Sequence, residues 1–305
     1  MRKLCIVLTL LLLLCGCSER NVSETEGLRI VTTLFPTYDF ARTIAGGKAD
    51  IKLLLTPGRE SHSYEPSTGD VIDISESDIF IYTGESMEPW AARIVENMDG
   101  PTVVDASKDI ELEKHEDDGH GHNHDREHSI GLDPHIWTDP HMCLTIVDNI
   151  LAAFVERDGE NADIYRANAA ALKAELTALD EEFRSITEAA KTKKIYHGGR
   201  FSLVYFAEEY GLAYESAYDS CGSDTEPSVR QICSMIDEMR ADGAKVVFYE
   251  ELSNNSVAKL IADETGAKPL LLHSCHNLTT EEFESGVTYI TLMKQNAENL
   301  REAIT

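Results

Sequence analysis

The sequence of 305 residues is poor in basic side chains. Its 27 lysines and arginines stand against 54 aspartates and glutamates, which gives a formal net charge of −27 at pH 7. No basic cluster interrupts this acidic excess. Such a surface repels nucleic acid and anionic lipid headgroups, so neither is expected as a partner. A divalent cation would be attracted, although an acidic surface also serves solubility alone.

Two classes of motif are also absent. The chain has no HExxH segment, the zinc-binding motif of many metalloproteases, and after residue 17 no two cysteines have the CxxC spacing of a zinc knuckle. A zinc-dependent hydrolase, with Glu65 or Glu250 as its general base, therefore stays only an alternative. Cys221 and Cys275 both follow predicted strands, and they are our candidate disulfide pair if the protein is exported. Buried free thiols are the alternative, because spacing does not determine pairing.

The apolar run near the start of the chain is too short to span a bilayer with comfort. Residues 6–14 follow two basic residues, which is typical of a secretory signal. The run ends in LCGC, which resembles a bacterial lipobox with Cys17 as the residue to be lipidated. We interpret residues 1–17 as a signal peptide and 18–27 as a tether, with an ordinary secretory signal as the alternative. This predicts a protein anchored by lipid to the outer face of a bacterial cell membrane.

Short β-branched or apolar runs alternate with helical patterns on both sides of a long central segment. This alternation predicts parallel sheets flanked by helices, and two such sets predict an α/β fold of two lobes. The expected strands are 28–34, 51–55, 78–82, 102–104, 194–197, 212–216, 245–249 and 269–272, and the expected helices include 38–45, 87–97, 229–240 and 256–265. We divide the chain into an N-terminal lobe at 28–158, a linking helix at 159–191 and a C-terminal lobe at 192–305.

The central segment has neither Gly nor Pro from residue 161 to residue 190. Its apolar residues recur with helical spacing at Leu172, Leu176, Leu179, Phe183 and Ile186. At about 1.5 Å per residue, such a helix would be about 45 Å long and could join the two lobes stiffly. A coiled-coil dimer arm is the rival interpretation. The apolar stripe covers only about two heptads where three or four are wanted, so a monomer is expected.

One segment, residues 113–129, combines histidines with acids and glycines and has no apolar residue. Its histidines are His115, His120, His122, His124 and His128. This composition cannot build a core, so a mobile loop is expected. The loop would gather metal ions by weak multivalent contacts, with a solvated spacer as the alternative.

Four histidines outside that segment are our candidate metal ligands. They are His62, His135, His197 and His273. Three of them follow or end predicted strands, and ligands of open α/β sheets bind outside the carboxyl ends of the strands. The fourth precedes a predicted helix and could close the set from a loop. Imidazole is the commonest transition-metal ligand at neutral pH, and a carboxylate often orients it. The carboxylates placed to do so are Asp133, Glu65 and Glu250.

Two segments carry a family resemblance. TPGRESHSYEP at 56–66 and DPHIWTDP at 133–140 resemble the N-lobe ligand motifs of the zinc/manganese solute-binding proteins of ABC importers. The likeness extends to 205–212, 264–268 and 289–300, and so covers nearly the whole chain after the signal. It implies two lobes joined by one rigid helix, metal bound between them and an ABC transporter permease as partner. It also implies that a His-rich acidic loop marks the zinc-preferring branch. A metal-binding adhesin or buffer without a permease is the alternative.

Two positions depart from the family pattern. Arg200 stands where the family has a His or Glu ligand, and a guanidinium cannot ligate a cation. We therefore expect His197, three residues earlier, to turn inward at the glycine pair that follows it. The alternative is that Arg200 pairs with an acidic residue and water fills the ligand position. His273 stands in the register of the family's usual Asp, and imidazole in place of carboxylate favours Zn²⁺ over Mn²⁺. His276 is the substitute for His273.

Overall fold

The computed structural model describes residues 27–96, 98–112, 132–218 and 227–305. The expected signal peptide, the His-rich segment and Cys221 with its expected disulfide lie outside these ranges, as does all but the last residue of the tether. In the described part of the chain, no helix has the length and apolar character that a membrane crossing requires.

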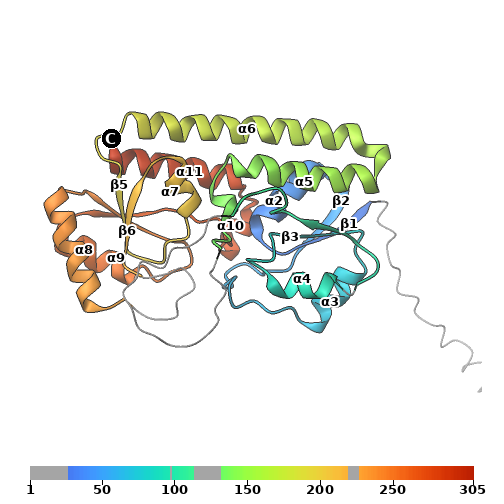
Figure 1. Cartoon of the computed structure of the whole chain (residues 1–305), viewed down its shortest axis with the longest axis horizontal. Coiled ribbons are helices and arrows are strands. Elements are labelled where there is room, and N and C mark those ends of the chain that lie inside the picture. The colour runs from blue at the N-terminus through green and yellow to red at the C-terminus, as the bar shows by residue number, and fades with distance from the viewer. Residues whose placement is uncertain (1–26, 97, 113–131, 219–226) are drawn as a thin grey trace, which may run out of the picture.

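Two four-stranded parallel sheets form the framework (Figure 1). The first sheet has the order β2-β1-β3-β4 and comprises β1 (Leu28–Thr32), β2 (Ala49–Leu53), β3 (Ile79–Tyr82) and β4 (Thr102–Asp105). The second has the order β6-β5-β7-β8 and comprises β5 (Lys194–His197), β6 (Ala213–Ser216), β7 (Val246–Tyr249) and β8 (Lys268–Leu271). All eight predicted strands are confirmed, and the predicted α/β class with them.

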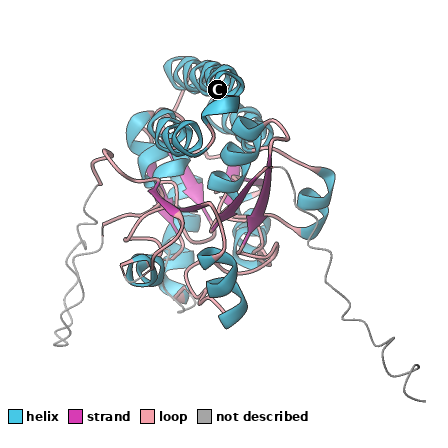
Figure 2. Ribbon diagram, turned by 90° about the vertical axis from the view of Figure 1, so that its right-hand side faces the viewer, coloured by secondary structure: helices cyan, strands magenta, loops and turns pink. Residues whose placement is uncertain are grey.

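Helices cover both sheets, so the strands lie inside layers of helix (Figure 2). Around the first sheet lie α2 (Phe35–Ala45), α3 (Thr68–Ser75), α4 (Pro89–Val95), α5 (Met142–Arg157) and the 3₁₀ turns η2 (Ile136–Thr138) and η3 (Gly159–Asn161). Around the second lie α7 (Val204–Glu209), α8 (Val229–Asp242), α9 (Ser256–Thr265) and α11 (Tyr289–Ile304). The short helix α10 (Thr280–Ser285) lies near the middle of the molecule, with Phe283 against Tyr38 of α2 (Figure 1). Capping boxes begin three of these helices, at Ser67, Ser228 and Thr279. These boxes satisfy main-chain N–H groups that have no partner within the helix.

The long central helix predicted from the sequence is α6 (Ala162–Glu188). Its 27 residues correspond to about 40 Å, and it runs along one side of the molecule over both sheets (Figure 1). The predicted apolar stripe is buried against α2, α5 and α11. Burial of this stripe within one chain leaves it unavailable as the seam of a coiled-coil dimer.

One continuous hydrophobic core serves both sheets. It runs from Ile30 on β1 through Phe183 on α6 to Phe206 on α7 and Phe248 on β7, all of which are buried. A core shared in this way resists relative movement of its parts, because close-packed side chains lose contacts when they slide.

Polar contacts tie the same two parts together. The Asp39 carboxylate on α2 accepts the Tyr289 N–H at the start of α11 at 2.7 Å. Arg42, also on α2, donates to the Val287 carbonyl at 2.5 Å and pairs with Asp39 at 2.6 Å. Desolvation by burial raises the pKa of Asp39, and the Arg42 charge opposes this. These bonds fix the first sheet's helix to the last helix of the chain.

Candidate metal centre

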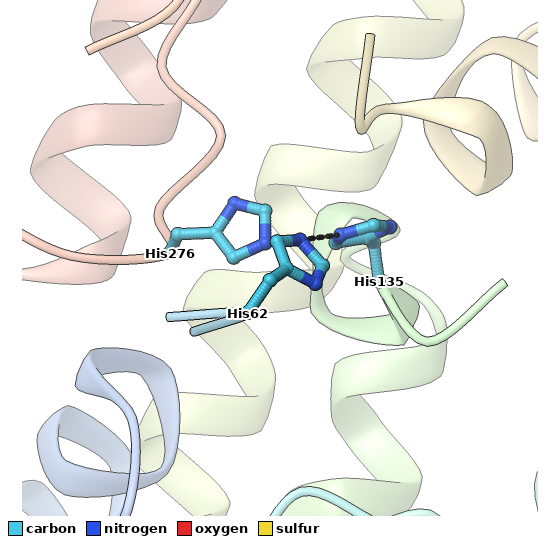
Figure 3. A group of neighbouring side chains, drawn as sticks. All are labelled: His62, His135 and His276. Atoms are coloured by element: carbon cyan, nitrogen blue, oxygen red, sulfur yellow. Dashed lines mark hydrogen bonds between the residues drawn. The ribbon is translucent and has the colours of Figure 1, made fainter. Parts of the chain in front are cut away.

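Three histidines from separate segments of the chain converge on one place (Figure 3). His62 lies in the loop after β2, His135 directly precedes η2, and His276 lies in the loop between β8 and α10. One ring nitrogen from each lies within 4.8 Å of the others. We call these three residues the His triad. Two of its segments follow the carboxyl ends of parallel strands, where ligands of such sheets bind.

His135 is held by a carboxylate. Its Nδ1 lies 2.8 Å from Oδ1 of Asp133, and the same oxygen accepts the His135 main-chain N–H at 2.8 Å. A carboxylate only accepts, so Nδ1 carries the proton and the neutral ring has a bare Nε2. Both side chains are buried. Asp133 thus turns the Nε2 lone pair of His135 toward the other two histidines, as a carboxylate does behind a metal-bound imidazole.

His276 is held by a hydroxyl. Its Nδ1 lies 2.8 Å from Oγ of Ser274, whose one proton is donated to Oε1 of Glu251 at 2.5 Å. The hydroxyl has no second proton to give, so His276 donates from Nδ1 and again has a bare Nε2. That Nε2 atom is buried and has no hydrogen-bond partner among the described residues. It is a nitrogen lone pair aimed into the His triad.

His62 completes the cluster from the exposed side. Its Nε2 lies 3.3 Å from Nε2 of His135, and its ring centroid lies 5.3 Å from those of both His135 and His276. Figure 3 shows the three rings turned toward one another, with the dashed line joining His62 and His135. Only His62 of the three is exposed, so a solvated ion would meet it first.

The environment of the triad favours uncharged imidazole. Desolvation lowers the pKa of His62, and the neighbouring His135 lowers it further. Burial lowers the pKa of His276 well below its ordinary value, followed by the effects of His135 and His62. In both rings the charged imidazole loses hydration, so the neutral form, which binds metal, is favoured in His62 and His276.

His197 and His273, two of the four expected ligands, lie outside this group. In both, Nδ1 accepts a main-chain N–H: from Gly199 at 3.2 Å and from Cys275 at 2.9 Å. In a neutral ring the proton then lies on Nε2, which in both residues is buried and has no hydrogen-bond partner among the described residues. Both rings are buried. The structure therefore brings together His62, His135 and the substitute His276, and it places the rings of His197 and His273 outside this group.

A pocket opens beside the triad, with walls from the loops of both sheets. Arg200, Glu250 and Glu251 line it together with His62 and His276. Glu250 does not lie among the triad nitrogens. Its Oε2 is 3.9 Å from Nδ1 of His197, and burial raises its pKa to about 7. The last expected carboxylate, Glu65, is exposed on the loop after His62.

Sequence reasoning missed the hydroxyl and carboxylate behind His276. Ser274 and Glu251 belong to different loops, so no local motif joins them. It also missed the main-chain donors that occupy His197 and His273. The one usable signal was the spacing of two residues between Asp133 and His135, which recurs between Ser274 and His276.

Three neutral imidazole nitrogens around one centre suit a tetrahedral Zn²⁺ ion and leave its fourth position open. The comparisons with known proteins agree with this chemistry. The model of the family described as "Zinc-uptake complex component A periplasmic" matches residues 30–303. The high-affinity zinc uptake system protein ZnuA of Bacillus subtilis is 33% identical over 302 residues, which cover 97% of this chain and 94% of that protein.

Longer relatives match as well. The zinc-binding protein AdcA of Streptococcus pyogenes is 30% identical over 92% of this chain, but the match spans only 57% of AdcA. Among solved structures, the metal-dependent lipoprotein YcdH of Bacillus subtilis has a TM-score of 0.78 at 31% identity, covering 91% of this chain and 100% of that one. The Zn(II)-bound ZnuA-like domain of Streptococcus pneumoniae AdcA has a TM-score of 0.76 at 27% identity, covering 91% and 98%. The chain therefore belongs to the ZnuA family of zinc-uptake components.

Proposed function

We propose that this protein captures Zn²⁺ outside the cytoplasm and delivers it to an ABC-type uptake permease, with His62, His135 and His276 as its protein ligands. The observation that carries the proposal is the convergence of three imidazoles whose ring nitrogens lie within 4.8 Å of one another. Membership in the ZnuA family and the names of the ZnuA and AdcA relatives support the metal and the transport role.

The donor set favours Zn²⁺ over Mn²⁺. Imidazole nitrogen suits Zn²⁺, whereas Mn²⁺ prefers carboxylate, carbonyl and water oxygens. The triad contributes three nitrogens and no oxygen. Water or a small ligand in the pocket would fill the fourth position.

The fold suits a receptor that changes shape little. The shared core and the bonds between α2 and α11 hold the two sheets in one arrangement. Exchange of the ion would then depend on the loops around His62, the exposed member of the triad. In our proposal, a lipid on Cys17 keeps the protein near its permease. The name of the zinc-binding lipoprotein AdcA of Streptococcus pneumoniae, 30% identical, supports such an anchor.

The two alternative functions, a hydrolase and an adhesin, differ in how well the comparisons support them. A hydrolase is disfavoured, because the family is one of zinc-uptake components. Adhesion is named together with metal transport for the laminin-binding protein of Streptococcus agalactiae, which is 27% identical to this chain. Such a role would be additional to metal binding and would use the same fold.

Titration of the metal-free protein with Zn²⁺ tests the proposal. We expect one tight site in the intact protein and a loss of affinity of about 100-fold or more in His276→Ala, because a ligand is removed. His273→Ala is the matched control, since His273 lies three residues away outside the triad. Its affinity should stay within a few-fold of the intact protein. Tight binding by His276→Ala would overturn the ligand set, and loss of binding by His273→Ala would then point to His273 as the ligand in its place.

A further inference from the structure

We propose that Glu251, acting through the hydroxyl of Ser274, is a positioning residue that sets the tautomer of His276 and so turns its Nε2 lone pair into the metal site. This inference rests on the proposed function, since it takes His276 as a ligand. It concerns two residues of the second sheet's loops, which follow β7 and β8.

With Glu251 as a carboxylate, the hydrogen bonds from Glu251 through Ser274 to His276 can run in one direction only. Glu251 accepts the Ser274 N–H at Oε2, 2.8 Å away, and the Ser274 hydroxyl at Oε1, 2.5 Å away. With its proton given to Glu251, the hydroxyl meets Nδ1 of His276 as an acceptor at 2.8 Å. The proton of the neutral imidazole therefore belongs on Nδ1. Glu251 determines the protonation of a ring that it does not touch.

The surroundings hold this chain in place. The Ser274 carbonyl accepts the indole N–H of Trp137 at 2.9 Å, and the Trp137 ring lies edge-on to His276 with centroids 4.9 Å apart. Cys275, between the two polar residues, has a φ of 60°, so the main chain bends sharply there. The bend lies between Ser274 and His276, whose Oγ and Nδ1 atoms are 2.8 Å apart. The main-chain N–H of Cys275 also holds His273 in the opposite tautomer.

The arrangement parallels the one behind His135. There a carboxylate accepts Nδ1–H directly, with Asp133 only two residues away. Behind His276 a hydroxyl is interposed, and this lets the carboxylate come from another loop. Carboxylates behind metal-bound imidazoles orient the ring and raise its basicity, and their loss typically weakens metal binding 10- to 100-fold.

The substitution Glu251→Gln reverses the chain without changing its shape. The main-chain N–H of Ser274 still donates to the side chain at residue 251, and only the amide oxygen of Gln can accept. The oxygen therefore takes the position of Oε2, and the amide NH₂ faces the Ser274 hydroxyl. The hydroxyl then accepts from the amide and donates to Nδ1 of His276, so the ring proton moves to Nε2. The lone pair that faced the metal site is lost.

The experiment is nitrogen NMR of the metal-free protein with labelled histidine, combined with Zn²⁺ titration. We expect His276 to be protonated at Nδ1 in the intact protein and at Nε2 in Glu251→Gln, with Zn²⁺ affinity reduced about 10- to 100-fold. Glu250→Gln is the matched control, because Glu250 precedes Glu251 in the sequence and its carboxylate lines the same pocket. It should leave the tautomer of His276 unchanged.

A second variant keeps the test valid if Glu251→Gln does not fold. Ser274→Ala removes the relay hydroxyl and should weaken Zn²⁺ binding while leaving His135 protonated at Nδ1. An unchanged His276 tautomer in Glu251→Gln would overturn the inference, even where His276→Ala abolishes binding and the proposed function stands. Normal Zn²⁺ binding by His276→Ala would instead sink the ligand set, whatever the tautomer.

Discussion

The Nε2 atoms of His62 and His135 lie 3.3 Å apart, within hydrogen-bond distance. Asp133 accepts from Nδ1 of His135, so in the metal-free protein His62 would be the donor of this bond. The bond joins two of the nitrogens that would hold the metal. Metal binding must displace this proton, and the exposure of His62 lets it exchange with solvent.

Replacing His62 should lower Zn²⁺ affinity without lowering the stability of the metal-free protein. His62→Ala removes a ligand from the exposed rim of the site, so Zn²⁺ affinity should fall about 100-fold or more. The melting temperature of the metal-free protein should change little, because surface substitutions usually cost less than about 0.5 kcal/mol. Calorimetric titration and thermal unfolding measure the two effects. Unchanged Zn²⁺ affinity in this variant would contradict the site.

The carboxylate of Asp133 should affect Zn²⁺ affinity through His135, without contacting the ion itself. Asp133→Ala removes the acceptor of Nδ1–H, and we expect Zn²⁺ binding about 10- to 100-fold weaker. Glu65→Ala is the control, because Glu65 is exposed on the loop after His62. Competition with a chromophoric chelator measures both. Equal losses in the two variants would show that Asp133 has no special role.

Zinc affinity should resist mild acid. The pKa values of His62 and His276 lie below the ordinary histidine value of 6.5, because desolvation within the cluster disfavours their charged rings. Protons therefore compete for these two ligands only when the pH falls below that value, and affinity should be nearly constant from pH 8 to pH 7. Zn²⁺ titrations over this range and down to pH 5, with circular dichroism to monitor folding, test this. A decline already between pH 8 and pH 7 would count against neutral imidazoles as the ligands.

His197 should govern acid stability, not zinc binding. Burial lowers its pKa to about 4, below the 6.5 of the unfolded chain. The unfolded state then binds more protons between these values, so stability is complete above pH 6.5 and is lost as the pH falls toward 4. The loss attributable to this residue is roughly 3 kcal/mol.

The variant His197→Asn keeps an acceptor for the Gly199 N–H but cannot be protonated. Urea unfolding at a series of pH values should give a flatter dependence of the free energy of unfolding in the variant. Its Zn²⁺ affinity at pH 7.5 should stay within a few-fold of the intact protein. Parallel pH curves for the two proteins would refute the assignment.

The shared core predicts cooperative unfolding. Leu176 on α6 is fully buried in the cluster that serves both sheets. Leu176→Ala should lower the free energy of unfolding by about 2–5 kcal/mol while preserving a single transition. Leu260→Ala, at a residue with 47% of its surface exposed, is the control and should change it by less than about 0.5 kcal/mol. Two separate transitions in urea would show that the sheets unfold independently.

Strand order along the chain, the long helix and the place of the site were readable from the sequence. The spacing of apolar residues and the local composition determine these features. The strand β3 is an apolar run of four residues, and the helix α6 repeats its apolar side chains with helical spacing. The two N-terminal motifs likewise singled out His62 and His135, whose rings lie side by side in the fold. Proximity of strand ends follows from parallel topology alone.

The choice among the remaining histidines was decided only in three dimensions. His273 and His276 are three residues apart in one loop, yet their Nδ1 atoms meet opposite partners: a main-chain donor at Cys275 and a hydroxyl acceptor at Ser274. Whether a histidine presents a lone pair to a metal depends on which nitrogen carries the proton. That depends in turn on Glu251, which reaches Ser274 from a different loop, and no pattern along the chain records such a contact.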